Sequence, residues 1–349
     1  YTNAKVRENY SRRFSITYPN EELPAARPVR ISPLYETLKA SNAVFGAAYG
    51  LEHALWFAPE GEEPLETPTF KRSNAFDTVR DECNAVRNGV GMIEISTFAK
   101  YEVTGPEAEA WISRILSNRM PRTGRIVLSP MLNPDSKLIG DFTVAKLADE
   151  QFYVFGSGIA EDYHMRWFEA HLPETGVSIR SRGLELTGLS IAGPKARDLL
   201  AKVTDADVSK QAMPFMSIKK MGIGTVPAMV GRITFTGDLG YEIWVKNISA
   251  VKVYDAIYSV GQNYGLVPFG LDALDVARIE AGFIMNGVDY FSANHCMTES
   301  RKSTPFELGL GWTVNLKNRG PFVGQEANTK MKQEGPQWSF VGLVLDWDE

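Results

Sequence analysis

The chain has 349 residues, of which 44% are hydrophobic and 23% charged, an ordinary globular composition with enough apolar material for more than one core. Its net charge of −5, without a long basic run, argues against binding to nucleic acid or to an anionic membrane surface. No apolar run is long enough to span a membrane, and the first residues lack a signal-peptide core.

The two cysteines, Cys83 and Cys296, lie far apart and outside metal-ligand spacing, so the sequence predicts neither a disulfide framework nor a zinc site. We therefore expect a cytoplasmic protein, or one of the mitochondrial matrix if the source is eukaryotic. Residues 1–31 are polar and charged and are typical of a linker. A β-type run at 340–349 stops without a turn, so we expect further sequence beyond both ends.

Periodicity predicts most of the elements between these ends. Helical spacing of apolar residues predicts helices at 33–40, 76–89, 106–116, 160–172, 194–202, 249–264 and 271–281. Alternation predicts strands at 92–95, 101–103, 126–132, 138–147, 151–155, 177–179 and 185–191. Because hairpins are mixed with helices rather than alternating strictly with them, we predict an α+β fold with antiparallel sheets. No glycine-rich dinucleotide motif or phosphate loop occurs, which disfavours nucleotide binding by this chain.

The stretch 231–245 reads as a β-hairpin, with arms at 232–235 and 241–245 joined by a glycine-containing turn at 236–240. Side chains of a strand alternate between faces, so Tyr241 and Ile243 fall on one side and Glu242 and Trp244 on the other. A lone acid on such a strand is ordinarily an exposed charge at a sheet edge. An acid beside a tryptophan on one face is nevertheless unusual.

A second acid, Asp141, interrupts the otherwise apolar strand 138–147. An unpaired buried carboxylate is costly, so Asp141 either faces solvent or has a polar function. Alternation predicts that it shares a face with Ile139 and Thr143. The histidines have neither metal-ligand nor catalytic-triad spacing, and we interpret them as structural or surface residues: His53, His164, His171 and His295. No metal site is predicted, and no nucleophile elbow of a serine hydrolase is present.

Several motifs, in this order and spacing, resemble the folate-dependent aminomethyltransferase family that includes the glycine-cleavage T-protein. They are Ile191-Ala-Gly-Pro194, Thr236-Gly-Asp-Leu-Gly-Tyr-Glu-Ile243, Asp272-Ala-Leu-Asp-Val-Ala-Arg-Ile-Glu-Ala-Gly282, Leu308-Gly-Leu-Gly-Trp312 and Phe322-Val-Gly-Gln-Glu326. Residues 1–70 resemble more narrowly the segment that joins the flavin oxidase half to the folate half in dimethylglycine and sarcosine dehydrogenases. The resemblance implies a linker at 1–31, two interleaved α+β subdomains at 32–290, and at 291–349 a connection followed by the start of a C-terminal β-barrel.

The resemblance also implies a tetrahydrofolate site. Glu242 matches the glutamate that binds the pterin ring, and Asp141 matches the aspartate that assists methylene transfer. The positions implied around the ligand's rings are Leu128, Thr143, Phe235, Tyr241 and Trp312. Two positions depart from the T-protein pattern: its Asp-Asp pair is Gly140-Asp141 here, and Leu274 replaces its arginine. The second departure removes the arginine implied to recognise the folate tail, and it therefore argues against amine transfer from a lipoyl carrier. A leucine at this position resembles the dehydrogenase branch.

The function implied is capture of the one-carbon unit released by oxidative demethylation of an N-methyl amine, with formation of 5,10-methylenetetrahydrofolate. FAD would lie on a preceding half or on a flavin oxidase partner, outside this sequence. Three alternatives remain open: a free-standing folate aminomethyl- or methyltransferase, a non-catalytic folate-binding assembly protein, and an inactive folate module that braces an oxidase. The motif 318–326 lacks the cysteine of the assembly proteins.

Overall fold

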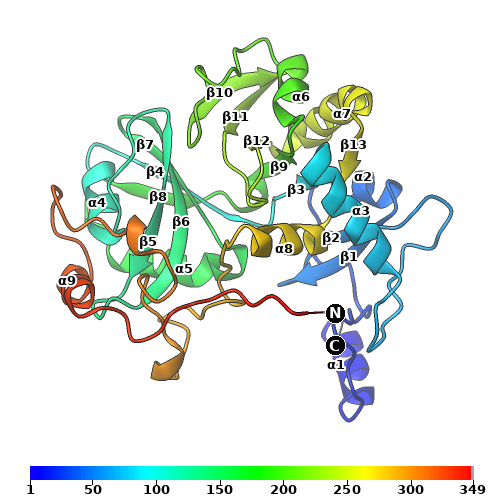
Figure 1. The fold of residues 1–349 in the computed structure, drawn as a ribbon, viewed down its shortest axis with the longest axis horizontal. Helices are drawn as coiled ribbons and strands as arrows, with labels where there is room; N and C mark the ends of the chain where they lie inside the picture. The colour runs from blue at the N-terminus through cyan, green and yellow to red at the C-terminus, as the bar shows by residue number, and fades with distance from the viewer. Residues whose placement is uncertain (347–349) are drawn as a thin grey trace. The chain divides into compact units, whose positions relative to one another are not determined.

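The computed structural model describes residues 1–346, which form two compact units built from alternating segments of the chain (Figure 1). Unit 1 comprises residues 1–97, 184–215 and 220–281, and unit 2 comprises residues 98–183, 216–219 and the described residues from 282 onward. Each unit combines helices with a largely antiparallel sheet, so the predicted α+β class is confirmed. No helix of the described chain combines the length and the apolar character that crossing a membrane requires.

Unit 1 is organised by a sheet with the strand order β10-β11-β12-β9-β3-β13. Its strands are β3 (Val90–Glu94), β9 (Leu186–Ala192), β10 (Ile218–Ile223), β11 (Val226–Gly231), β12 (Gly240–Lys246) and β13 (Leu266–Pro268), with a separate hairpin of β1 (Ala43–Ala48) and β2 (Leu51–Phe57). Its helices are α1 (Thr2–Ser11), α2 (Tyr35–Ala40), α3 (Ala75–Asn88), α6 (Ala196–Val203), α7 (Ala250–Gly261) and α8 (Leu271–Glu280).

The core of unit 1 lies between this sheet and the helices α6 and α7. Strand β12 contributes Tyr241 and Ile243, both fully buried, and these side chains pack with Leu199 of α6 and Ile257 of α7. Each such burial contributes about 1.5–3 kcal/mol to folding before entropy is subtracted. Because these two residues anchor one face of β12, Glu242 and Trp244 are held on the other face, as alternation predicted.

The predicted hairpin around β12 is correct in its second arm and wrong in its first. The partner strand is β11, so residues 232–239 form an irregular connection instead of a strand and a tight turn. The reason is local: Thr234 Oγ1 accepts a hydrogen bond from the Thr236 amide, and Thr236 Oγ1 accepts one from the Asp238 amide. These side-chain bonds satisfy backbone groups that a strand would pair across a ladder.

Unit 2 is organised by a sheet with the strand order β5-β6-β7-β4-β8. Its strands are β4 (Ala99–Thr104), β5 (Arg125–Leu132), β6 (Leu138–Ala148), β7 (Gln151–Gly156) and β8 (Ser178–Ser181), and its helices are α4 (Ala108–Ile115), α5 (Glu161–Ala170) and α9 (Gln325–Glu334). The core beneath the sheet is rich in aromatic residues, with Phe142 of β6 packed against Tyr101 and Phe168. It holds β6, the strand that carries Asp141, from one side.

Alternation fails at one position of β6. The pairing with β5 steps from Met131–Gly140 to Leu132–Leu138, so Ile139 is an extra residue without a partner, a β-bulge. Because of the bulge, the Ile139 side chain packs in the core with Phe142. Ile139 therefore does not share the face of Asp141 and Thr143. The expected grouping of Ile139 with those two residues is therefore wrong.

The ends of the chain hold elements that periodicity did not predict. Residues 2–11 of the expected linker form α1, a helix that buries none of its residues, and α9 begins within the motif at 322–326. No strand is assigned to residues 335–346, and the rest of the predicted run at 340–349 lies outside the described residues. The start of a C-terminal barrel stays a prediction.

Gly188 of β9 pairs with Trp244, and it leaves room for the indole ring. A Cβ at Gly188 would lie 2.8 Å from the Ile95 Cγ1 atom and closer still to the Trp244 ring. We expect Gly188→Ala to lower the free energy of unfolding by about 1–3 kcal/mol, the usual cost of overpacking. Urea denaturation will measure it, with Gly320→Ala as the control because a Cβ there meets nothing within 4 Å. Equal stability of both variants would contradict this packing.

Candidate functional site

Three of the predicted site residues lie together on the outward face of the β5–β6 pair in unit 2. Leu128 is directly opposite Thr143, and Pro130 is opposite Asp141, so Asp141 and Thr143 are neighbours on one face. Leu128, Asp141 and Thr143 are partly exposed. Phe142 and Val144, the two neighbours of Thr143 in β6, are buried. Unit 2 thus presents a carboxyl group, a hydroxyl group and an apolar side chain on one small surface.

The Asp141 carboxyl is held by a residue that sequence reasoning missed. The Tyr290 hydroxyl donates a hydrogen bond to Asp141 Oδ1, and the tyrosine side chain is itself buried. Burial raises the pKa of Asp141, and the bond from Tyr290 acts in the opposite direction. The pKa of Asp141 is therefore raised above that of an ordinary exposed aspartate, which favours its use as a proton donor as well as an acceptor. No signal in the sequence marks Tyr290, because it lies in an irregular segment.

A buried histidine explains the glycine before Asp141. His164 of α5 lies under β6, where its Nε2 contacts the Ile139 carbonyl oxygen at 3.2 Å. Burial lowers the pKa of His164 to about 4, so the ring is neutral and Nε2–H donates this bond. A Cβ at position 140 would lie 2.7 Å from the ring's Cε1 atom. Gly140 and His164 therefore fit together, and this histidine is structural, as interpreted.

Glu242 of unit 1 lies on β12, opposite Gly231 and Ser190 of the neighbouring strands. The residue is partly exposed, but burial of its carboxyl group raises the pKa to about 8, and a hydrogen bond from the Trp244 side chain opposes that rise. The pairing of acid and tryptophan seen in the sequence is thus a direct contact. It leaves the Glu242 carboxyl with further acceptor capacity for donors of a ligand.

The other predicted positions have different surroundings. Phe235 is partly exposed in the connection before β12, and Trp312 is 70% exposed on a 3₁₀ helix of unit 2 (Gly311–Thr313). Tyr241 is fully buried in the unit 1 core, where its hydroxyl accepts a hydrogen bond from Arg197 Nε at 3.0 Å. Its predicted contact with a ligand gains no support from this packing. Leu274 is buried on α8.

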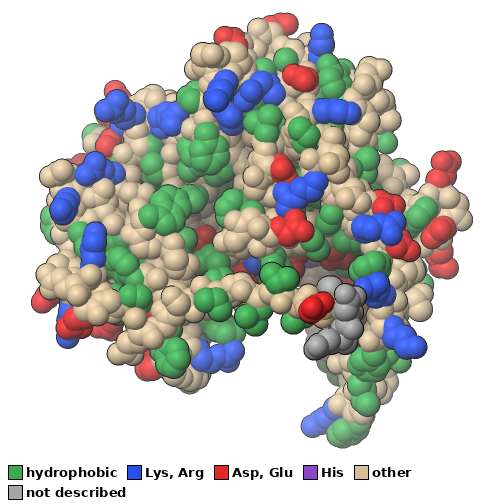
Figure 2. All heavy atoms as spheres, viewed as in Figure 1, with side chains coloured by type: hydrophobic (Ala, Val, Ile, Leu, Met, Phe, Trp, Pro, Cys, Tyr) green, Lys and Arg blue, Asp and Glu red, His purple; other side chains and the backbone are tan. Residues whose placement is uncertain are grey.

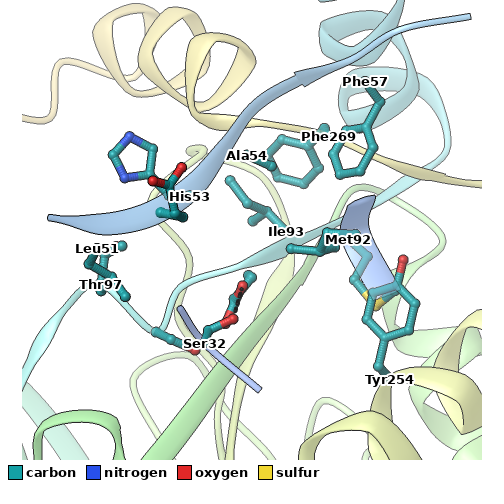
Figure 3. Close-up of a pocket in the computed structure, with 14 residues that line it drawn as sticks. Ser32, Leu51, His53, Ala54, Phe57, Met92, Ile93, Thr97, Tyr254 and Phe269 are labelled. Atoms are coloured by element: carbon teal, nitrogen blue, oxygen red, sulfur yellow. Dashed lines mark hydrogen bonds between the residues drawn. The ribbon is translucent and has the colours of Figure 1, made fainter. Parts of the chain in front are cut away.

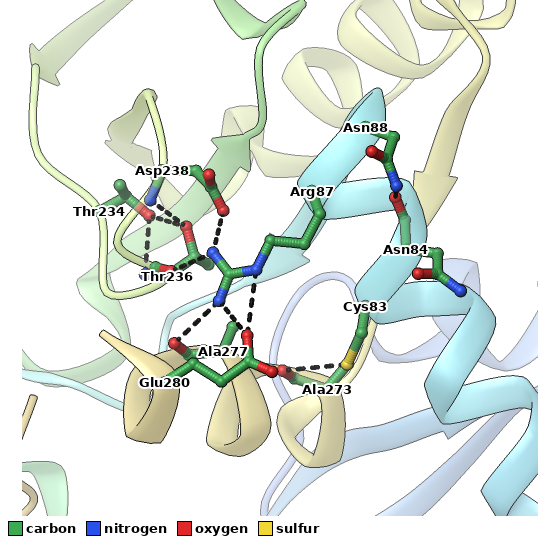
Figure 4. Close-up of polar contacts among 10 residues, drawn as sticks. All are labelled: Cys83, Asn84, Arg87, Asn88, Thr234, Thr236, Asp238, Ala273, Ala277 and Glu280. Carbon is green, nitrogen blue, oxygen red and sulfur yellow. Dashed lines mark hydrogen bonds and ion pairs between the residues drawn. The ribbon is translucent and has the colours of Figure 1, made fainter. Parts of the chain in front are cut away.

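Arg87 of α3 fixes the connection that leads into β12 (Figure 4). Its Nη1 donates to the Thr236 carbonyl oxygen at 3.0 Å and also binds the Asp238 carboxylate. Its Nη2 binds Glu280 of α8 at 2.6 Å and the Ala277 carbonyl oxygen at 3.3 Å. One guanidinium group therefore ties the motif at 236–243 to the motif at 272–282.

Unit 1 also contains a small enclosed cavity between the β1–β2 hairpin and β3 (Figure 3). Polar groups of Ser32, His53 and Glu94 line it beside apolar side chains, and its volume is about 10 Å³. That is room for about one water molecule, far less than an organic ligand needs. None of the predicted site residues lines this cavity.

Two further features of the described residues are the distribution of charged side chains and the grouping of possible metal ligands. On the face drawn in Figure 2, positive and negative side chains are interspersed with apolar ones. Among the described residues, no group of three or more His, Cys, Asp or Glu side chains could hold a metal ion.

The sequence and the fold match a known class of protein. Residues 34–318 match the family described as "GCVT N-terminal domain", and residues 1–32 match "FAD dependent oxidoreductase central domain". The fold is similar to that of the glycine cleavage system aminomethyltransferase T from Bartonella henselae, with a TM-score of 0.72 and 23% identity over 88% of this chain and 76% of that one. The chain belongs to the GCVT family of folate-dependent aminomethyltransferases, and the predicted resemblance is confirmed.

The similar proteins include dehydrogenases of dimethylglycine and sarcosine. "Dimethylglycine dehydrogenase, mitochondrial" of Mus musculus is 32% identical over 352 residues, which cover 100% of this chain and 39% of that protein. "Sarcosine dehydrogenase, mitochondrial" of Homo sapiens is 28% identical over 97% of this chain and 40% of that protein. The chain thus spans about two fifths of the length of both relatives. An aminomethyltransferase of Thermoanaerobacter sp. (strain X514) is 32% identical over 77% of this chain and 71% of that protein.

The contacts of Arg87 predict how the connection before β12 moves. We expect Arg87→Met to accelerate hydrogen exchange of the amides at 234–239, because Thr236 and Asp238 lose the group that fixes them. Exchange followed by mass spectrometry will measure this. Arg80→Met is the matched control, since Arg80 lies on the same helix and its bonds within the described chain go to the exposed Asp77 and Asp81. Equal exchange in the two variants would contradict a fixing role for Arg87.

Proposed function

We propose that this chain is a tetrahydrofolate-binding one-carbon transfer module. It would take up the formaldehyde or iminium carbon released by oxidative demethylation of an N-methyl amine and form 5,10-methylenetetrahydrofolate. The observation that carries the proposal is the Asp141 carboxyl group, which has a raised pKa and lies on a partly exposed face beside Leu128 and Thr143. Membership of the folate-dependent family and the dehydrogenase relatives support it.

The reaction with formaldehyde needs a group that both gives and takes a proton. Two N–C bonds form, the carbonyl C–O bond breaks, and the oxygen leaves as water. Tetrahydrofolate would supply the two nitrogen nucleophiles. In the protonated state Asp141 would give its proton to the departing oxygen, and as a carboxylate it would accept the proton released by a nitrogen. The raised pKa favours the protonated state relative to an ordinary exposed aspartate, so donation of a proton becomes easier than it would be for such a group.

Glu242 is the proposed anchor of the pterin ring. The pterin's amino group and ring N–H are two donors that one carboxylate can accept together. The Trp244 side chain already holds this carboxyl group, so its orientation precedes ligand binding. Phe235, Leu128, Thr143 and Trp312 are proposed to contact the rings, and the folate tail would bind without the arginine that Leu274 replaces.

The proposed source of the one-carbon unit is a flavin oxidase, present as a preceding domain or a separate subunit that holds FAD. The match of residues 1–32 to an FAD-dependent oxidoreductase domain and the length of the dehydrogenase relatives support this partner. A free-standing aminomethyltransferase is the second candidate, favoured by the Thermoanaerobacter relative. Leu274, which replaces the T-protein's arginine, argues against amine transfer from a lipoyl carrier. In a free-standing enzyme, residues 1–32 would also have no role.

The first test replaces the proposed proton-transfer group. We expect Asp141→Asn to lower methylenetetrahydrofolate formation from formaldehyde and tetrahydrofolate by about 10²-fold or more, measured above the protein-free rate. Tetrahydrofolate affinity, measured by calorimetry, should change little because the amide keeps the size of the side chain. A variant that transfers as fast as the original protein would refute the role of Asp141, and absence of folate binding in the original protein would refute the proposed function.

The second test uses the pKa of Glu242. Near pH 7 this carboxyl group is mostly protonated, since its pKa is about 8, whereas a pterin with two donors favours the carboxylate. Binding should therefore release up to about one proton per site, and affinity should rise as the pH increases toward 8. Calorimetry in buffers of different ionisation enthalpy measures the release.

Glu242→Gln should abolish this release and weaken binding, whereas Glu60→Gln, at an exposed position of the same unit, should leave both unchanged. Proton release that persists in Glu242→Gln would assign it to another group.

A further inference from the structure

We propose that Tyr290 is a positioning residue for Asp141: its hydroxyl fixes one carboxylate oxygen so that the other oxygen faces the transferred one-carbon unit. This inference rests on the proposed function of Asp141 and adds a residue that the family motifs do not mark.

The bond between the two side chains is specific to one oxygen. Tyr290 donates to Asp141 Oδ1, and in the described part of the chain it is the only side chain bonded to this carboxyl group. The Asp141 amide also bonds to this carboxyl group, and since that bond occupies one acceptor site at most, Oδ2 keeps at least one of its own. A carboxyl group on a strand can rotate about its side-chain torsions, and a bond at one oxygen selects a single orientation. The reactive oxygen is then Oδ2.

The donor is rigidly placed. Tyr290 is 2% exposed and packs in a cluster with Leu132, Leu138 and Phe322. Its carbonyl oxygen accepts a hydrogen bond from the Gly287 amide at 2.8 Å. A phenol ring enclosed by apolar side chains keeps one rotamer, so the hydroxyl has a fixed position relative to its own backbone.

The segment that carries Tyr290 is tied to the strand that carries Asp141. The Ala293 amide donates to the Leu138 carbonyl oxygen at 2.8 Å, and the Leu138 amide donates to the Ser303 carbonyl oxygen at 2.9 Å. Both bonds meet β6 at Leu138, close to Asp141 in the same strand. Donor and acceptor thus share one local frame within unit 2, and movement of the segment as a whole carries both groups together.

The charge environment keeps the hydroxyl a donor. Burial and the neighbouring Asp141 charge raise the pKa of Tyr290, with Tyr163 as the further titratable group that contributes. The phenol is therefore protonated throughout the pH range in which Asp141 titrates. Its bond also lowers the pKa of Asp141, opposing burial, so loss of the hydroxyl would raise that pKa.

Tyr290→Phe removes the hydroxyl and keeps the ring. We expect folate affinity to change little, the rate of methylene transfer to fall by about tenfold, and the acid limb of the pH–rate profile to move to higher pH. The ¹³C resonance of the Asp141 carboxyl group, followed by NMR titration, should report the same upward movement of the pKa without any turnover. Tyr101→Phe is the matched control, because its buried hydroxyl in the same unit donates to the Glu161 carbonyl oxygen at 2.9 Å, away from Asp141.

The double variant Asp141→Asn, Tyr290→Phe should transfer no more slowly than Asp141→Asn alone, since Tyr290 acts through Asp141. Suppose that Asp141→Asn suppresses transfer, but Tyr290→Phe gives the same transfer rate, pH–rate profile and NMR titration as Tyr101→Phe. The proposed positioning role of Tyr290 is then refuted, and the proposed function stands. If Asp141→Asn itself leaves transfer unchanged, the proposed role of Asp141 fails, and if the original protein does not bind tetrahydrofolate, the proposed function fails. In either case the NMR titration still decides whether Tyr290 controls the carboxyl group.

Discussion

A buried carboxyl group must find a hydrogen-bond donor or give up its charge, and this constraint shapes both candidate sites of the molecule. On β6 the donor for Asp141 is the hydroxyl of Tyr290, and on β12 the donor for Glu242 is the side chain of Trp244. In both places an aromatic residue supplies the side-chain donor, joined at Asp141 by the aspartate's own amide, and the other face of the strand packs into an apolar core. The pKa of each acid stays raised because these hydrogen bonds do not replace the hydration that burial removes.

Alternation along strands predicted much of this from the sequence alone. It placed Glu242 with Trp244 and Asp141 with Thr143, because each strand has a core-facing set of residues strong enough to fix its register. It failed at Ile139, where an extra residue reverses the alternation, and at 232–239, where threonine side chains bond the backbone. Tyr290 and Arg87 could not be predicted, since each acts on residues more than a hundred positions away. Nothing local marks such a partner.

The two departures from the T-protein pattern differ in what the structure explains. Gly140 has a physical reason, because the His164 ring occupies the space that a side chain at position 140 would need. An acid at this position would require a smaller residue on α5, so the two positions are expected to change together. Leu274 is buried in the unit 1 interior, where an apolar side chain packs without needing a partner. The two departures thus lie at separate places, Gly140 in unit 2 and Leu274 in unit 1.

The contacts of Arg87 also limit the order in which unit 1 can fold. The residues it binds, Thr236, Asp238, Ala277 and Glu280, follow it by about 150 to 190 positions in the chain. Sequence separation of this size slows folding, because the loop must close before the contact can form. During synthesis Arg87 can bind Thr236 and Asp238 before α8 exists, but its bonds to α8 must wait until residue 280 has left the ribosome. A nascent chain stopped before α8 therefore has Glu242 on a strand whose entry lacks that link. Ligand added to such a chain would meet an incomplete anchor.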